Sequence, residues 1–122
     1  MQITLYGIPN CDTVRKARAW LADNGIDYQF HDFRKAGVSA DLLRAWLAEM
    51  PWDALVNRRG ATWRGLPEAR RDAVVDADSA SAVMLESASV IKRPVLAAFD
   101  GVHIGFSAEQ YAQLFGRTSP LY

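Results

Sequence analysis

The sequence has few of the residues that build disulfides or metal sites. Among its 122 residues there is one cysteine, Cys11, and there are two histidines, His31 and His103. One cysteine excludes an intramolecular disulfide, and two distant histidines lack the spacing of zinc ligands. We therefore expect no metal site, and any disulfide must link Cys11 to a small thiol or to another protein.

The sequence also lacks net charge and long hydrophobic runs. Its 14 basic and 14 acidic residues cancel, so it offers no overall electrostatic attraction to nucleic acid or to an anionic membrane. No apolar run approaches the roughly 20 residues of a transmembrane helix, and the first residues lack the features of a signal peptide. We expect a cytoplasmic protein that binds neither nucleic acid nor a membrane directly.

What is present indicates one globular domain over 1–116, followed by a tail over 117–122. Half of the residues are hydrophobic and 23% are charged, which is ordinary for a chain of this length. Hydrophobic periodicity, capping residues and turn residues predict strands and helices in the order βαβ, helices, ββα. The strands are predicted at 2–6, 27–32, 95–99 and 102–106, the last two joined by an Asp100-Gly101 turn. The helices are predicted at 11–24, at 39–49, from Pro67, from Asp78 or Ser79 to Glu86, and after Ser107.

Cys11 lies where the first strand gives way, through a loop containing Pro9 and Asn10, to the first helix. Unpaired N–H groups and the helix dipole stabilise a thiolate at a helix start and lower the pKa of the cysteine. Arg15, one turn later, adds positive charge. Most lone cysteines are buried and behave as small hydrophobic residues, which is the alternative for Cys11. Its place in a loop favours a reactive thiol.

Three segments, 6–13 (YGIPNCDT), 57–64 (NRRGATWR) and 91–94 (IKRP), together resemble the arsenate reductase (ArsC)/Spx family, and most of all its YffB-type branch. The resemblance covers nearly the whole chain. It implies an α/β thioredoxin-like fold, in which helices flank a mixed sheet and a helical insertion spans about 39–89. It also implies that Pro94 is a cis-proline that faces Cys11 from the start of the third strand.

The resemblance further implies chemistry at Cys11. In arsenate reductases the cysteine thiolate attacks the oxyanion, arginines hold it, glutathione resolves the adduct and glutaredoxin regenerates the thiol. Arg93 matches one anion-holding arginine. Strict register places Asn57 at a second, whereas the Asn-x-Arg-Gly pattern of YffB-type relatives favours Arg59. Whether Arg58 or Arg59 faces the site stays open at this point.

The sequence departs from the plasmid-type reductases at three positions. Gly7 stands in place of a histidine before the cysteine, Val14 in place of a serine after it, and Phe106 in place of a third anion-binding arginine. These changes remove groups that stabilise a thiolate and bind an oxyanion, so we do not expect efficient arsenate reduction.

We therefore predict a glutathione-dependent thiol reductase, an oxidoreductase related to the arsenate reductases. Cys11 is its single catalytic nucleophile, and the predicted substrate-binding residues are Asn10, Arg15, Arg59, Arg93 and Pro94. Glutathione is expected as co-substrate, with no bound cofactor, and glutaredoxin as a possible partner of a monomeric protein. The alternative is a non-catalytic regulator like Spx, which binds RNA polymerase. Spx proteins typically carry a Cys-x-x-Cys switch, and here its second position is Val14.

Overall fold

The computed structural model describes residues 2–116, and the chain forms two compact units. The first unit is built from the residues up to His31 and from Arg93 onward, and the second is Asp32–Lys92. The single domain over 1–116 stays a prediction, and the expected tail over 117–122 lies outside the described residues. Within the described part of the chain, no helix has the length and apolar character needed to span a membrane.

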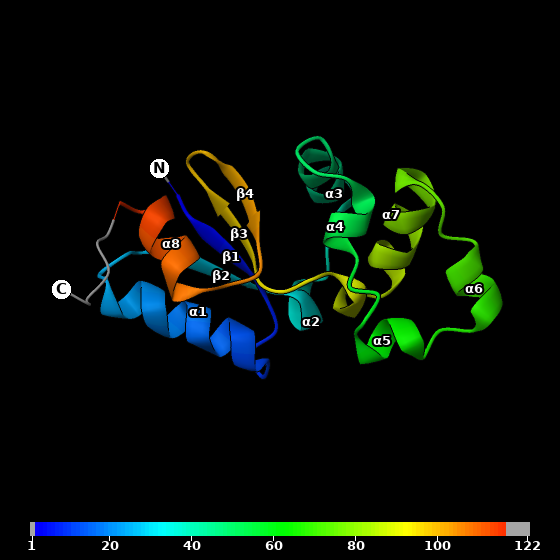
Figure 1. The fold of residues 1–122 in the computed structure, drawn as a ribbon, viewed down its shortest axis with the longest axis horizontal. Helices are drawn as coiled ribbons and strands as arrows, with labels where there is room; N and C mark the ends of the chain where they lie inside the picture. Colours follow the sequence, from blue (N-terminus) through cyan, green and yellow to red (C-terminus); the bar gives the residue numbers. More distant parts are fainter. Residues whose placement is uncertain (1, 117–122) are drawn as a thin grey trace. The chain divides into compact units, whose positions relative to one another are not determined.

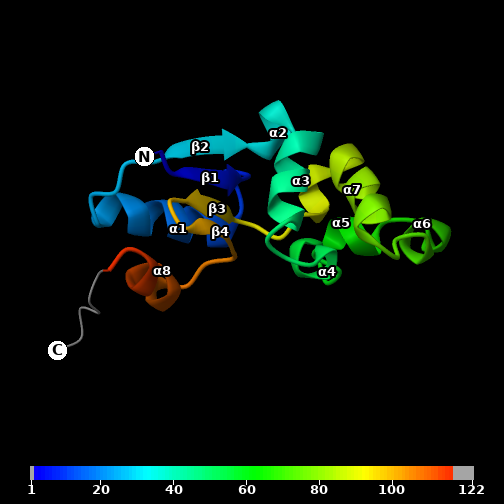
Figure 2. The ribbon, with the colours of Figure 1, turned by 90° about the horizontal axis from the view of Figure 1, so that it is seen from above.

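The first unit is organised around a four-stranded sheet, with strand order β2-β1-β3-β4 (Figure 1). Its strands are β1 (Thr4–Gly7), β2 (Gln29–Asp32), β3 (Val95–Ala98) and β4 (Gly101–Ile104). Strand β3 is antiparallel to both β1 and β4. Strands β1 and β2 run in the same direction (Figure 2), as expected for two strands joined through a helix. The sheet is therefore mixed, as predicted.

Helices α1 (Asp12–Asp23) and α8 (Ala108–Leu114) pack on one face of this sheet. The fully buried residues that join strands and helices there are Leu5, Ala17, Leu21, Leu96 and Tyr111. Leu5 and Leu96 are register partners on β1 and β3, so they project from the same face of the sheet. Trp20 of α1 meets the ring of Tyr111 edge-on at 5.6 Å, which ties α1 to α8.

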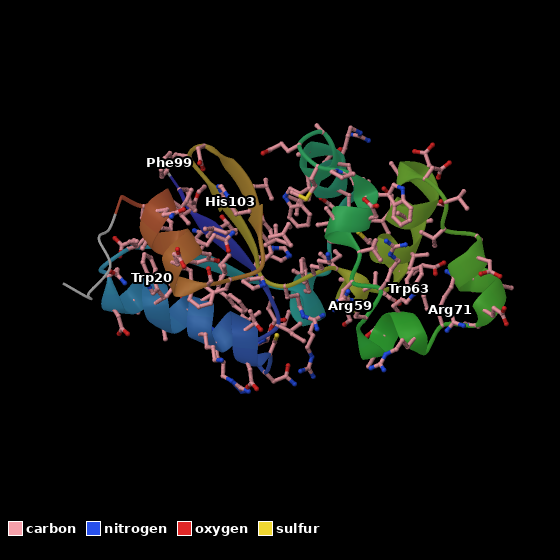
Figure 3. All side chains as sticks on the ribbon, viewed as in Figure 1. Trp20, Arg59, Trp63, Arg71, Phe99 and His103 are labelled. Atoms are coloured by element: carbon pink, nitrogen blue, oxygen red, sulfur yellow. The ribbon has the colours of Figure 1, made fainter. Side chains whose placement is uncertain are left out.

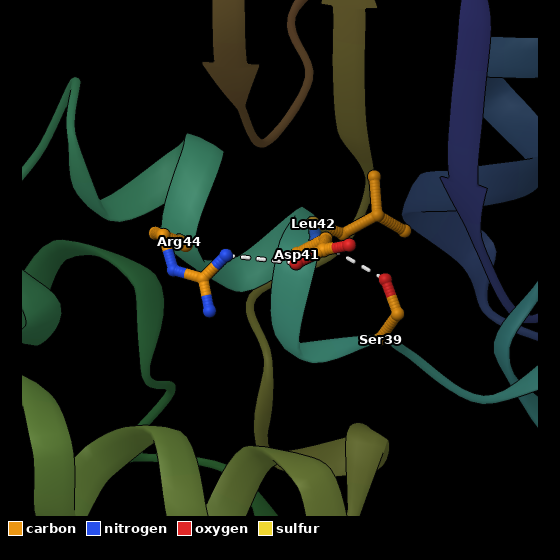
Figure 4. Close-up of polar contacts among 4 residues, drawn as sticks. All are labelled: Ser39, Asp41, Leu42 and Arg44. Atoms are coloured by element: carbon orange, nitrogen blue, oxygen red, sulfur yellow. Dashed lines mark hydrogen bonds and ion pairs between the residues drawn. The ribbon is translucent and has the colours of Figure 1, made fainter.

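The second unit is helical. Its elements are α2 (Phe33–Ala36), α3 (Ala40–Leu47), α4 (Trp52–Leu55), α5 (Ala61–Arg64), α6 (Glu68–Asp72), α7 (Ala77–Glu86) and the 3₁₀ turn η1 (Ala88–Val90). Helices α3 and α7 pack together and bury Leu43, Trp46, Ala80, Val83 and Met84. Ser39 caps α3, as predicted, by accepting a hydrogen bond from the N–H of Leu42 at 3.1 Å (Figure 4).

Three details differ from the sequence predictions. Helix α7 begins earlier than predicted, because Asp76 is its N-cap and Ser79 completes a capping box. The hairpin loop is Phe99-Asp100, since Ala98 pairs with Gly101, which has a φ of 134° and is the first residue of β4. The short elements α2, α4, α5 and η1 were not predicted, because three or four residues show no helical period.

Candidate functional site

The register between β1 and β3 brings two distant segments of the chain together. Tyr6 pairs with Val95 in an antiparallel ladder, so the residues that follow β1 lie beside those that precede β3. The first segment leads to Cys11, and the second is the Arg93-Pro94 pair, whose peptide bond is cis as predicted. The carbonyl of Pro94 accepts a hydrogen bond from the N–H of Gly105 at 2.8 Å, which fixes this segment next to the end of β4.

Cys11 is the N-cap residue of α1. Its backbone is extended (φ −96°, ψ 128°), and its carbonyl accepts the first hydrogen bond of the helix, from the N–H of Arg15 at 2.9 Å. The buried face of α1 is formed by Val14, Ala17 and Leu21, whereas Cys11 is only partly buried. The thiol is therefore a group at the start of the helix, and it is not part of the core.

The surroundings of Cys11 favour its ionised form. Burial alone raises the pKa of the Cys11 thiol, because a thiolate loses hydration. The N–H of Val14, the guanidinium of Arg93 and the N–H of Thr13 outweigh that effect by donating to the sulfur, and the positive charge of Arg93 adds to them. The net result is a lowered pKa for Cys11.

Two other predicted site residues of this unit, Arg15 and Asn10, are exposed. The guanidinium of Arg15 pairs with Asp12 at 2.6 Å, and both side chains are exposed. Arg15 is not among the groups that shift the pKa of Cys11. Asn10 is exposed in the loop before Cys11. Within residues 2–116, no group of three or more His, Cys, Asp or Glu side chains is placed to hold a metal ion.

Arg59 belongs to the second unit, in the segment between α4 and α5 (Figure 3). Its side chain is exposed, and its backbone N–H donates to Oδ1 of Asn57 at 3.1 Å. The neighbouring Arg58 lies over the ring of Trp52, with 5.6 Å between the guanidinium carbon and the ring centre. The choice between Arg58 and Arg59 as the second anion-holding residue stays a prediction.

Two of the departures from the plasmid-type reductases are in contact with each other. A Cβ atom at Gly7 would lie 2.7 Å from Cγ2 of Val14, closer than carbon atoms approach in proteins. The branched side chain of Val14 therefore occupies the space that a side chain at position 7 would need. The third departure, Phe106, is partly buried and packs edge-on against Tyr111 at 4.7 Å, so its ring lies against the core of this unit. Sequence reasoning identified these positions but not their packing roles, which depend on tertiary structure.

The sequence pattern that defines the ArsC family matches residues 6–114. The chain belongs to the ArsC family. Among solved structures, the YffB protein is 42% identical with a TM-score of 0.87, and the alignment covers 92% of this chain and 97% of that one. An arsenate reductase (ArsC) related protein from Brucella melitensis is 50% identical with a TM-score of 0.73, covering 94% of this chain and 95% of that one. The predicted family and the thioredoxin-like α/β fold class are thus confirmed.

This chain also resembles transcriptional regulators. The global transcriptional regulator Spx of Streptococcus pyogenes is 27% identical over 122 residues, covering 94% of this chain and 86% of the regulator. The relatives of this chain therefore include both arsenate reductase-related proteins and Spx proteins. Family membership alone does not distinguish a reductase from a regulator, so the function is inferred from the chemistry of the site.

Proposed function

We propose that this member of the ArsC family is a glutathione-dependent thiol reductase with Cys11 as its single nucleophile. The observation that carries the proposal is the setting of that thiol, whose pKa is lowered by two helix N–H groups and by Arg93. The thiolate is the form of cysteine that attacks disulfides, and lowering its pKa increases its population near neutral pH.

The proposed reaction is the reduction of a mixed disulfide between glutathione and a substrate thiol. The Cys11 thiolate attacks the glutathione sulfur, the substrate S–S bond breaks, and the substrate leaves as a thiolate that takes up a proton. A second glutathione, as thiolate, attacks the glutathione sulfur of the Cys11 adduct. This step restores the Cys11 thiolate and produces oxidised glutathione. In the net reaction the substrate sulfur is reduced to a thiol and the second glutathione is oxidised to a disulfide with the first, so no second protein cysteine is needed.

We assign Arg93 two tasks in this reaction. Its guanidinium stabilises the Cys11 thiolate before attack and after release, and its remaining N–H groups suit a carboxylate of glutathione. Asn10, Arg15, Arg59 and Pro94 are proposed to contact the substrate. A glutaredoxin as an alternative resolving thiol, the monomeric state and a cytoplasmic location stay predictions.

Arsenate is proposed to be a poor substrate of this protein. Gly7 and Val14 fill the space beside the start of α1 with apolar atoms, and the ring of Phe106 packs on Tyr111. None of these three residues has a side chain that offers a hydrogen bond or a charge to a developing oxyanion. The transition state for attack on arsenate therefore lacks stabilisation from these positions.

Turnover of a glutathione mixed disulfide tests the proposal. The assay contains reduced glutathione, the mixed disulfide of glutathione with 2-mercaptoethanol, and glutathione reductase, whose NADPH consumption is followed. We expect turnover well above the protein-free rate, its loss in Cys11→Ser, and a decrease of about tenfold in Arg93→Gln, as for loss of a charge-assisted hydrogen bond. Lys16→Gln, which changes an exposed charge on α1, is the matched control and keeps wild-type turnover. Full turnover in Cys11→Ser refutes the assignment.

The similarity to Spx supports a second candidate function, binding to RNA polymerase as a regulator. The same preparations distinguish the two. Absence of turnover in the wild type, together with binding to purified RNA polymerase that Cys11→Ser retains, favours the regulator. Turnover that depends on Cys11 favours the reductase.

A further inference from the structure

A hollow of about 460 Å³ lies between helices α3 and α7 of the second unit. The two helices pack against each other (Figure 1), and the segment of each contributes four residues to the lining of the hollow. The four follow one another at helical spacing in both segments, so together they form one continuous face. All of them are exposed or half-buried, so this face is open to a partner.

The two sides of the hollow have the same pattern of side-chain sizes. Each side consists of two small residues, one leucine and one charged residue. The uncharged members are Ala40, Leu47 and Ala48 on the side of α3, and Ala77, Ser81 and Leu85 on the side of α7. A leucine of a facing helix fits between small side chains, as in helix bundles. Each side of the hollow can therefore receive a leucine like that of the other side.

The charged residues on the two sides have opposite signs. They are Arg44 on α3 and Asp78 on α7, and among residues 2–116 Asp78 has no ion-pair partner. The guanidinium of Arg44 pairs with Asp41 at 2.8 Å (Figure 4), but Asp41 does not line the hollow. A guanidinium has five N–H donors, so Arg44 retains donors for a second carboxylate. Each side of the hollow thus offers a charge that complements the charge of the other side.

The face also exposes a large hydrophobic side chain. Leu85 is 45% exposed, although its neighbours Val83 and Met84 on the same helix are buried. Among the described residues, only two other large hydrophobic side chains are exposed, Val75 and Phe99. A leucine on a concave face gains free energy when a partner covers it, so this face has the composition of a protein-contact surface.

We propose that a second copy of this chain docks on this face through the same face of its own. A two-fold axis along the hollow places α3 of each copy opposite α7 of the other. Arg44 of one copy then meets Asp78 of the second copy, and this ion pair occurs twice. Leu85 of each copy enters the space beside Ala40 and Ala48 of the other. A different protein would have to match the charges and the sizes independently, whereas this chain already contains both halves.

The proposed dimer is weak. Each copy contributes the eight residues of this face, fewer than the roughly 20–30 residues a side of a stable interface. Its Kd therefore lies above about 1 μM, the weak end for interfaces of standard size, and the monomer expected from the sequence prevails at low concentration. All of these residues belong to the second unit, so the dimer does not depend on the chemistry proposed for Cys11.

Sedimentation equilibrium of the full chain, from about 10 μM to about 1 mM, tests the proposal. A reducing agent is present, so that a disulfide of Cys11 does not link two copies. We expect the apparent mass to rise with concentration toward that of a dimer. Leu85→Ser is expected to raise the Kd about tenfold, because two buried leucines are lost per dimer. Phe99→Ser is the matched control, since it removes an exposed hydrophobic side chain of the first unit.

Charge reversal tests the two-fold arrangement. Arg44→Glu and Asp78→Lys are each expected to raise the Kd about tenfold, since each turns two attractive pairs into two repulsive ones. Both residues are exposed, and circular dichroism verifies that each variant keeps its helices. An equimolar mixture of the two variants is expected to associate about as well as the wild type, because opposite charges then meet at both positions.

Self-association that Leu85→Ser weakens, that Phe99→Ser leaves unchanged and that the mixture of charge variants restores supports the dimer. A wild type that stays monomeric to about 1 mM overturns the proposal, and the face then belongs to a different partner. Self-association that Leu85→Ser leaves unchanged also overturns it, because the contact then lies elsewhere. A mixture that associates no better than its two components excludes the two-fold arrangement and with it the proposal.

Discussion

The contact between Gly7 and Val14 predicts that the smallest possible side chain at position 7 destabilises the protein. In Gly7→Ala the new Cβ would lie 2.7 Å from Cγ2 and 3.3 Å from Cγ1 of Val14. Favourable carbon–carbon contacts lie at about 3.5–4.0 Å, so one methyl group must move by nearly an ångström. Val14 is fully buried, and its branched side chain is restricted to one main rotamer in a helix. We expect a loss of about 2–3 kcal/mol in the free energy of unfolding, at the upper end for overpacking.

A second substitution, at Val14, tests whether this loss of stability comes from the contact between positions 7 and 14. Val14→Ala alone removes two buried methyl groups and should cost about 2 kcal/mol, from transfer at about 0.8 kcal/mol per group plus the cavity. In Gly7→Ala with Val14→Ala, the new methyl group enters the space that the old ones leave. We therefore expect the double variant to be about 1–2 kcal/mol more stable than the sum of the single effects predicts.

Urea unfolding of the four proteins, followed by circular dichroism, measures these free energies. A cost below about 0.5 kcal/mol for Gly7→Ala, the level of an ordinary surface change, contradicts the reasoning. An additive double variant also contradicts it, because the two positions would then be independent. By the same contact, a histidine at position 7, as in the plasmid-type reductases, requires a smaller residue at position 14.

Three further predictions follow from other buried or capped groups. Tyr111→Phe should raise the free energy of unfolding by about 1 kcal/mol in urea titrations, because the buried hydroxyl has no hydrogen-bond partner among the described residues. A decrease of about 1 kcal/mol in the free energy of unfolding would contradict this prediction. Asp76→Ala should lower it by about 1 kcal/mol through loss of the α7 cap, and Asp78→Ala, which leaves the cap intact, should cost less. The lowered pKa of Cys11 means that the unfolded chain holds its thiol proton to higher pH than the folded chain. The stability of the wild type relative to Cys11→Ser should therefore rise as the pH increases from the pKa of Cys11 in the folded protein toward about 8.5, its value in the unfolded chain. This added stability is lost as the pH falls through the pKa of the folded protein. A difference in stability that does not change with pH would contradict the prediction.

Local sequence signals predicted the parts of the fold that depend on neighbouring residues. Helix α1 and the N-cap of α3 at Ser39 were predicted from periodicity and capping residues. The elements α2, α4 and α5 have only four residues each, and each buries a single large side chain: Phe33, Leu55 and Trp63 respectively. Such turns form because tertiary packing covers those side chains, and a sequence pattern does not report that packing.

For the candidate site, too, the sequence predicted the local features and not those that depend on tertiary structure. The start of α1 at Cys11 is visible in the sequence, since a Pro-containing loop precedes an amphipathic helix. The approach of Arg93 depends on the register between β1 and β3, and it was predicted only through the family resemblance. The pairing of Arg15 with Asp12 follows the common three-residue spacing of helical ion pairs, which the sequence shows directly.

The most direct test of the central claim, that Cys11 is a stabilised thiolate, is its rate of alkylation by iodoacetamide as a function of pH. The wild type, Arg93→Gln and the control Lys16→Gln are compared, each in native and in denatured form. The account predicts a native wild-type midpoint below the ordinary cysteine value of about 8.5, a higher midpoint in Arg93→Gln, and an unchanged one in Lys16→Gln. A native midpoint at or above 8.5, or one that Arg93→Gln leaves unchanged, contradicts the account.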